Sequence, residues 1–139
     1  MIGVLLATHG EFAAGILDGA ELIMGKQENC QIVALRHGDS IEAFSTSILS
    51  AIKALNQGAG VIVFTDLYAG SPYNEAALNH KKLIEVEYRL VSGVNLPMLL
   101  EAFNQRLLGS SLEETLVQSL QSGSQGIKEF FTELKKIGN

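Results

Sequence analysis

Short runs of consecutive apolar residues alternate along this chain with stretches in which apolar residues recur at helical spacing. The runs lie at residues 1–9, 31–35 and 61–65, and residues 86–91 supply a further strand with Tyr88 and Leu90 among its buried candidates. Together these segments predict four β-strands. The helical stretches fill the segments between these runs and continue after the last of them. This alternation is typical of βαβ units. We therefore predict an α/β fold with an open, mainly parallel four-stranded sheet and helices on both of its faces.

Local signals mark where the helices begin and end. Asp39-Ser-Ile-Glu42 fits a capping box ahead of the second helix. Ser71 suits the N-cap of the third helix, with Pro72 at the first helical position. Asn95 suits the N-cap of the fourth helix. The small residues 122–126 should break or kink the helical pattern near the C-terminus.

The length of 139 residues predicts one domain. We expect its core to occupy about residues 1–110, followed by a C-terminal helical segment at about 111–137. That segment could pack on its own domain or reach across to a partner subunit. The single cysteine, Cys30, excludes an intrachain disulfide, and its apolar neighbours predict a small core residue.

Composition narrows the function classes. The net charge is −5 and the ten Lys and Arg residues are dispersed, so nucleic-acid binding is not expected. No apolar stretch approaches the roughly 20 residues of a membrane span, and no basic leader precedes the first strand. We expect a cytoplasmic protein that could still dock peripherally onto a membrane complex.

Two of the predicted strands end in side chains that carry chemistry. His9 follows the first apolar run, and Asp66 follows the third. Ligands of open α/β sheets bind outside the carboxyl ends of the strands, so the active site is expected there. If the two strands are neighbours, His9 and Asp66 meet at one edge. A carboxylate bound to one ring nitrogen would leave the other nitrogen free as a nucleophile.

The segment after Asp66 adds a place for an anion. A helix that begins near Gly70 and Ser71 offers unpaired backbone N–H groups and the positive end of its dipole, both of which suit a phosphate. Ser71 adds a hydroxyl, and Gly70 allows close approach of the backbone. Together with His9 these groups describe a histidine that accepts and releases a phosphoryl group without a metal or cofactor.

Three segments resemble a known family. They are residues 2–10 with Phe12-Ala-Ala-Gly15 following, residues 64–74, and residues 92–99. They are similar to the IIA domains of the mannose family of the phosphoenolpyruvate-dependent sugar phosphotransferase system. The likeness runs from Met1 to about Gly126, with the motifs in order.

The resemblance implies a phosphocarrier. His9 would be phosphorylated on Nε2, Asp66 would hold Nδ1–H, and Ser71 with the surrounding amides would receive the phosphate. The donor would be the phosphohistidine of HPr, and the acceptor would be a histidine of a IIB domain. IIB would then phosphorylate a sugar entering through membrane IIC and IID subunits. The resemblance also implies a homodimer, while the sugar itself is not read from a IIA domain.

Some positions depart from the family or lie beside its motifs. Leu67 stands where the best-known members have a threonine, which puts one hydroxyl contact to phosphate or to Asp66 in question. Ala69 stands in place of a glycine and restricts the loop backbone. The rim of the site is expected to include Arg36, Tyr68 and Asn95.

Several alternatives stay open at this point. The phosphocarrier subunit of dihydroxyacetone kinase shares this fold and strategy. A small metal chelatase would need a second imidazole in the cleft, with His37 the nearer and His80 the poorer candidate. Arg36-His-Gly38 resembles the signature of histidine phosphatases, but it follows the second strand rather than the first. A non-catalytic binding domain is the fourth alternative.

Overall fold

The computed structural model describes residues 1–138 and confirms the predicted α/β class. The four strands are β1 (Gly3–His9), β2 (Cys30–Leu35), β3 (Val61–Thr65) and β4 (Tyr88–Val91). They lie in the order β2-β1-β3-β4, and every pairing is parallel. The helices are α1 (Phe12–Met24), α2 (Ile41–Leu55), α3 (Ser71–Leu78), the 3₁₀ turn η1 (Asn79–Lys82), α4 (Leu96–Leu107), α5 (Leu112–Gln125) and α6 (Phe130–Gly138).

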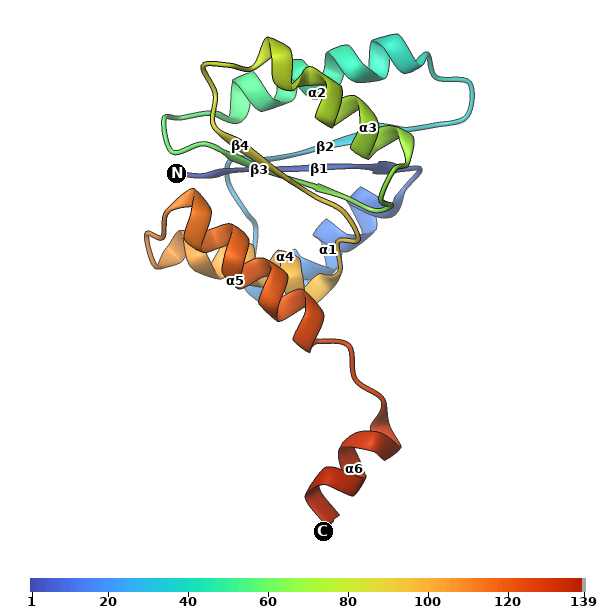
Figure 1. Cartoon of the computed structure of the whole chain (residues 1–139), viewed down its shortest axis with the longest axis vertical. Helices are drawn as coiled ribbons and strands as arrows, with labels where there is room; N and C mark the ends of the chain where they lie inside the picture. Colours follow the sequence, from blue (N-terminus) through green and yellow to red (C-terminus); the bar gives the residue numbers. More distant parts are fainter. Residues whose placement is uncertain (139) are drawn as a thin grey trace.

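Helices cover both faces of the sheet. α2 and α3 lie on one face, and α1, α4 and α5 lie on the other (Figure 1). Alternate residues of a strand point to opposite faces, so Val4 and Leu6 pack toward α1 and α4, whereas Leu5 and Ala7 pack toward α2. This double cover explains why the central strands β1 and β3 appear in the sequence as unbroken apolar runs.

The strand register places the ends of β1 and β3 together. Ala7 of β1 pairs with Thr65 of β3, and His9 pairs with Leu35 of β2. His9 and Asp66 therefore leave the sheet at the same edge, beside the end of β2. β1 and β3 are neighbours, which is the condition under which His9 and Asp66 were expected to meet.

Two of the predicted caps are displaced by one residue. Ser40, not Asp39, caps α2, because its hydroxyl accepts the N–H of Ala43 at 3.2 Å. Asp39 instead accepts the N–H of Arg36 at 2.8 Å and closes the preceding turn. Gly70 is the N-cap of α3, so Ser71 is the first helical residue rather than the cap.

The third predicted cap is confirmed. Asn95 caps α4, and its side-chain oxygen accepts the N–H of Met98 at 3.0 Å.

The edge strands are less buried than their apolar sequences indicate. β4 begins at Tyr88 rather than at residue 86, because the N–H of Val86 donates to the carbonyl of Leu83 and closes a turn. Tyr88 is half-buried, and its hydroxyl donates to the carbonyl of Ala76 at 2.9 Å. Cys30 starts edge strand β2 and is also half-buried, where burial raises the pKa of its thiol to about 11.

The C-terminal part differs from the expectation in two respects. Leu112 joins the core and α5 packs along α4, so the packed core extends beyond residue 110. α5 also continues through the predicted break as far as Gln125. A methyl group at Gly123 would lie 2.7 Å from Met98, so glycine there permits close approach of the two helices. The chain then leaves the body, and α6 stands away from it (Figure 1).

Candidate functional site

His9 and Asp66 form a double contact at the carboxyl edge of the sheet. The backbone N–H of His9 donates to Oδ2 of Asp66 at 3.1 Å. Nδ1 of the imidazole lies 2.9 Å from the same oxygen and 3.1 Å from Oδ1. Asp66 is therefore held by both the main chain and the ring of His9, and the ring in turn has a defined orientation.

This contact determines what the imidazole presents to solvent. An ionised carboxylate only accepts hydrogen bonds, so Nδ1 carries the proton and Nε2 keeps its lone pair. The side chain of His9 is 44% exposed, whereas that of Asp66 is 14% exposed. The carboxylate is thus shielded behind an accessible ring. The arrangement suits a nucleophile at Nε2 with a charge partner at Nδ1.

The N-terminus of α3 lies against the same ring. A methyl group added at Gly70 would lie 3.1 Å from Cε1 of His9, the ring carbon bonded to both nitrogens. The first-turn amides of α3 have no carbonyl partners within the helix, and Pro72 supplies no N–H. Ser71, half-buried at the start of this turn, adds a hydroxyl. The expected anion-binding groups therefore come together beside His9.

The loop between Asp66 and Gly70 is held in a strained conformation. Ala69 has φ = +62°, in the left-handed region that disfavours side chains. Asn74 stabilises this conformation, because its side-chain amide donates to the carbonyl of Ala69 at 3.0 Å. Alanine thus does occupy a position where glycine would fit without strain. Leu67, in the same loop, is 59% exposed.

Two tyrosines flank this loop. Tyr68 is 71% exposed, and its ring packs against that of Tyr73 with centroids 5.0 Å apart. Tyr73 is half-buried, so it supports the exposed ring from beneath. Tyr68 therefore occupies the accessible position that was expected of a rim residue.

An open groove of about 680 Å³ begins at His9 and extends toward the end of β2. It is lined by His9, Gly10, Glu11, Leu35, Arg36 and His37. Arg36 forms an ion pair with Glu11 across this groove, and both side chains are exposed. The guanidinium therefore lies at the site and is held by an acidic partner from the start of α1.

The structure does not place every expected residue in this groove. The side-chain amide of Asn95 donates to the carbonyl of Gly123 at 2.9 Å and its oxygen caps α4, and Asn95 is not among the residues that line the His9 groove. Through these two hydrogen bonds, the Asn95 side chain links the start of α4 to α5. His80 lies on η1, which follows α3 away from the carboxyl edge. Of the two other histidines, only His37 lines the groove with His9.

Sequence reasoning missed Glu11. Its only signal was its place next to a His-Gly turn, since the pairing with Arg36 joins residues 25 positions apart. Thr8 was also missed, although its buried hydroxyl accepts the N–H of Ala13 at 2.9 Å and fixes the start of α1.

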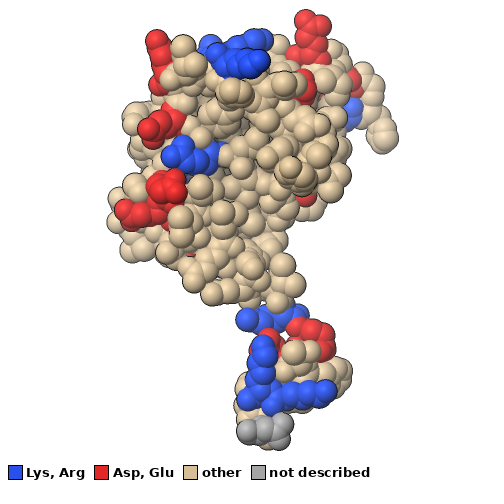
Figure 2. Space-filling model, in the orientation of Figure 1, with Lys and Arg blue, Asp and Glu red and all other residues tan. Residues whose placement is uncertain are grey.

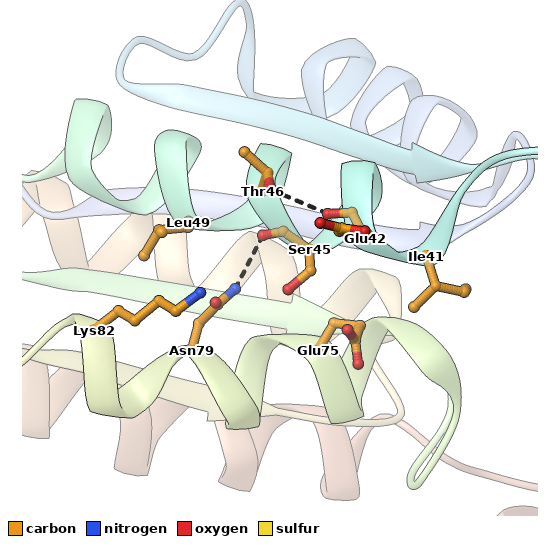
Figure 3. Close-up of a pocket in the computed structure, with 8 residues that line it drawn as sticks. All are labelled: Ile41, Glu42, Ser45, Thr46, Leu49, Glu75, Asn79 and Lys82. Carbon is orange, nitrogen blue, oxygen red and sulfur yellow. Dashed lines mark hydrogen bonds between the residues drawn. The ribbon is translucent and has the colours of Figure 1, made fainter.

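A second cavity, of about 330 Å³, lies between α2 and α3 (Figure 3). Glu42, Glu75 and Lys82 line it, and the amide of Asn79 donates to the carbonyl of Ser45 at 3.0 Å. None of the expected site residues lines this cavity. The chemistry that the sequence predicts is therefore confined to the edge where His9 lies.

Comparison with known proteins identifies the family. The family model described as the fructose IIA component of the PTS, the phosphotransferase system, matches residues 3–120. The chain belongs to this IIA family. The IIA chain is 31% identical to the fructose-specific EIIA component of Bacillus subtilis, over 76% of this chain and 71% of that protein. The family resemblance stated from the motifs is thereby confirmed.

Two further relatives place the IIA chain among sugar-system components. It is 30% identical to the mannose-specific EIIAB component of Escherichia coli K12 over 91% of its own length, but it spans only 39% of that protein. Its structure matches that of EIIA from Streptococcus agalactiae with a TM-score of 0.83 and 29% identity, over 95% and 99% of the two chains. These matches favour a sugar phosphotransferase component over the dihydroxyacetone kinase relay.

The placement of charged side chains on the IIA chain and the character of its helices both bear on the dispersed charge and apolar pattern that the sequence predicts. On the face shown in Figure 2, Lys and Arg side chains lie at a few places on the body, and others lie beside acidic side chains on the C-terminal segment. Within residues 1–138, no helix is both long and apolar enough to span a bilayer.

Proposed function

We propose that this IIA chain relays phosphoryl groups through Nε2 of His9. The observation that carries the proposal is the fixed imidazole: Nδ1 faces Asp66 at 2.9 Å while the start of α3 lies against Cε1. The donor is the phosphohistidine of HPr, and the acceptor is a histidine of a IIB protein. The roles of His9, Asp66, Gly70 and Ser71 are part of this proposal.

In the first step the Nε2 lone pair of His9 attacks the phosphorus of phospho-HPr. A new P–N bond forms as the P–N bond of the donor breaks, and the bonding electrons return to the HPr imidazole. The ring of His9 keeps its proton on Nδ1 throughout. Because bond formation at Nε2 makes the ring cationic, the carboxylate of Asp66 stabilises it at a distance of 2.9 Å.

The start of α3 receives the transferred group. Ser71 and the free first-turn amides donate to the phosphoryl oxygens, and the helix dipole favours their negative charge. Such transfer depends on positioning and electrostatics, so fixed donors of this kind supply what the step needs. Attack by a IIB histidine on the phosphorus forms the next P–N bond, breaks the bond to Nε2 and regenerates free His9. Phosphorylated IIB then passes the group to a sugar entering through IIC and IID.

The direct test is intact mass of the purified chain after incubation with phosphoenolpyruvate, enzyme I and HPr. One acid-labile phosphoryl group should be gained, and the gain should depend on HPr. No gain with HPr present would overturn the relay as proposed. A homodimer, as the family resemblance implies, is a separate part of the proposal and is measured by solution mass.

Gly70→Ala should slow transfer without destabilising the protein. The backbone of Gly70 has φ = −75°, which alanine adopts freely, but the new methyl would lie 3.1 Å from the His9 ring and 3.2 Å from the carbonyl of Leu67, and the exposed ring is expected to shift. A displacement of this kind is expected to cost about ten- to a hundredfold in rate. Rapid-quench time courses with phospho-HPr measure the rate of phosphoryl transfer, and urea unfolding measures the free energy of unfolding.

Gly15→Ala is the matched control for that change. A methyl group at Gly15 would meet nothing within 4 Å, and the position lies in helix α1. It should leave the transfer rate unchanged and raise the free energy of unfolding by about 0.5–1 kcal/mol. An unchanged rate in Gly70→Ala would show that the ring does not need its present position.

Arg36→Ala should weaken the approach of phosphorylated partners. The Arg36 guanidinium lines the His9 groove and is paired with exposed Glu11, so an incoming phosphoryl group can attract it. A rim charge acts mainly on association, so we expect a loss of about tenfold in transfer rate at low salt that shrinks as salt rises. Transfer rates measured at several ionic strengths test this prediction. Lys53→Ala, in the last turn of α2, serves as the control. Equal transfer rates for the two variants would contradict the role given to Arg36.

A further inference from the structure

Arg36 combines a fixed backbone with an exposed side chain. Its backbone N–H donates to Oδ2 of Asp39 at 2.8 Å, and its carbonyl accepts the N–H of Asp39 at 3.1 Å. Its side chain is 54% exposed and forms an ion pair with Glu11, whose side chain is 71% exposed. The base of the Arg36 side chain is therefore held in place, while its charged end is able to change partners.

The fold sets Arg36 beside the ring of His9. His9 pairs with Leu35, the residue before Arg36, and the N–H of Gly10 donates to the carbonyl of Leu35 at 2.8 Å. Neighbouring strands lie about 4.8 Å apart, so Arg36 begins one strand away from the imidazole. Asp66 contacts the ring from the β3 side, whereas Arg36 lines the groove that extends from His9 toward β2.

We propose that Arg36 changes partners when His9 is phosphorylated: it leaves Glu11 and binds the phosphoryl group on Nε2. This inference rests on the phosphoryl relay proposed above, and it adds a switch that the state of His9 sets. In the free chain Glu11 holds the guanidinium. In the phosphorylated chain the Glu11 carboxylate is unpaired at the rim of the groove, and no covalent bond changes in the exchange.

Charge decides the direction of the exchange. The Glu11 carboxylate carries one negative charge, whereas a phosphoryl group carries about −1.5 to −2 near neutral pH and presents three acceptor oxygens. A guanidinium matches two such oxygens with parallel N–H bonds. An ion pair between exposed side chains contributes little, because water solvates both charges well. Arg36 therefore gains more at the phosphoryl group than it loses at Glu11.

Arg36 supplies a charge that the rest of the phosphate site lacks. Among the described residues that line the groove, it is the only lysine or arginine. The other expected donors, Ser71 and the first-turn amides of α3, are neutral. Glu11 competes with the phosphoryl group for this cation, so it makes the phosphorylated state less favourable. The pair therefore sets the equilibrium of phosphoryl transfer between HPr and the chain.

The equilibrium constant for transfer from phospho-HPr tests the exchange, and intact mass of both proteins measures it. Arg36→Gln should lower the constant about tenfold, because the phosphoryl group loses a charged donor. Glu11→Gln should raise it about threefold, mainly by slowing return of the group to HPr. Glu42→Gln is the matched control, since this exposed carboxylate at the start of α2 does not line the groove. It should leave the constant unchanged.

A double-mutant cycle separates the exchange from simple repulsion. If Glu11 acts by holding Arg36, Glu11→Gln should have a smaller effect in the Arg36→Gln background, where there is no ion pair to break. An equal or larger effect there would mean that Glu11 merely repels the phosphoryl group, and it would overturn the exchange. An equilibrium constant that Glu11→Gln leaves unchanged or lowers would overturn it as well.

Inorganic phosphate tests the same competition without HPr. In an NMR titration, Glu11→Gln should bind phosphate about threefold more tightly than the unaltered chain, and Arg36→Gln should bind it more weakly. Equal phosphate affinity in all three chains would overturn the exchange, even where HPr phosphorylates His9 normally. A chain that gains no phosphoryl group from phospho-HPr would overturn the relay, and with it an exchange driven by phosphorylation. The two failures are therefore told apart by the mass gain.

Discussion

Replacing His9 by alanine is expected to abolish phosphorylation of the chain by phospho-HPr. In the proposed relay the new P–N bond forms only at Nε2 of this ring, and no other residue of the site offers a nucleophile in that position. The fold should remain intact, because the side chain is 44% exposed at the end of β1 and belongs to neither core cluster. Intact mass spectrometry after incubation with phosphoenolpyruvate, enzyme I and HPr gives the result directly.

His37→Ala is the natural control for that experiment. His37 lines the same groove, but it follows edge strand β2, and within residues 1–138 no carboxylate pairs with it as Asp66 pairs with His9. The His37→Ala chain should gain one phosphoryl group as the unaltered chain does. A phosphoryl gain that survives in His9→Ala and disappears in His37→Ala would assign the carrier role to the other imidazole.

Replacing Asp66 by asparagine is expected to lower the transfer rate by about 10²–10⁴-fold. The amide oxygen can still accept the backbone N–H of His9, which the native carboxylate accepts at 3.1 Å. It carries no charge to stabilise the cationic ring, and its NH₂ group favours the wrong tautomer at Nδ1. Single-turnover transfer from phospho-HPr measures the loss, and urea unfolding reports any change in stability.

Glu11→Gln provides the matched control, since Glu11 is another carboxylate at the same edge but pairs with Arg36 instead of His9. Its transfer rate should stay within a few-fold of the unaltered chain. Transfer at the normal rate in Asp66→Asn would refute the role given to Asp66. An equal loss in both variants would mean that the total negative charge of the edge, rather than the contact with Nδ1, governs the rate.

Local sequence patterns were sufficient for most of the fold. The central strands are buried on both faces, so their residues must be apolar without interruption, and this makes them easy to recognise. Edge strands lack that requirement, and β4 begins only at Tyr88 because Val86 closes a turn with Leu83. The cap of α2 shifted by one residue for a different reason: Asp39 and Ser40 can both cap a helix, and Asp39 closes the turn at Arg36 instead.

For the candidate site, too, some features follow from local sequence and others only from the tertiary structure. The residue types at the ends of β1 and β3 and at the start of α3 were enough by themselves to single out the groups of the proposed relay, because strand ends and helix starts are local features. Only the tertiary structure decided that Nδ1 of His9 meets Asp66, that Glu11 holds Arg36 and that Asn95 joins α4 to α5 instead of lining the groove. These contacts join residues 25 to 57 positions apart. Residues so far apart in the sequence come into contact only when strands pair and helices pack. No local pattern of apolar and polar residues predicts which of them will meet.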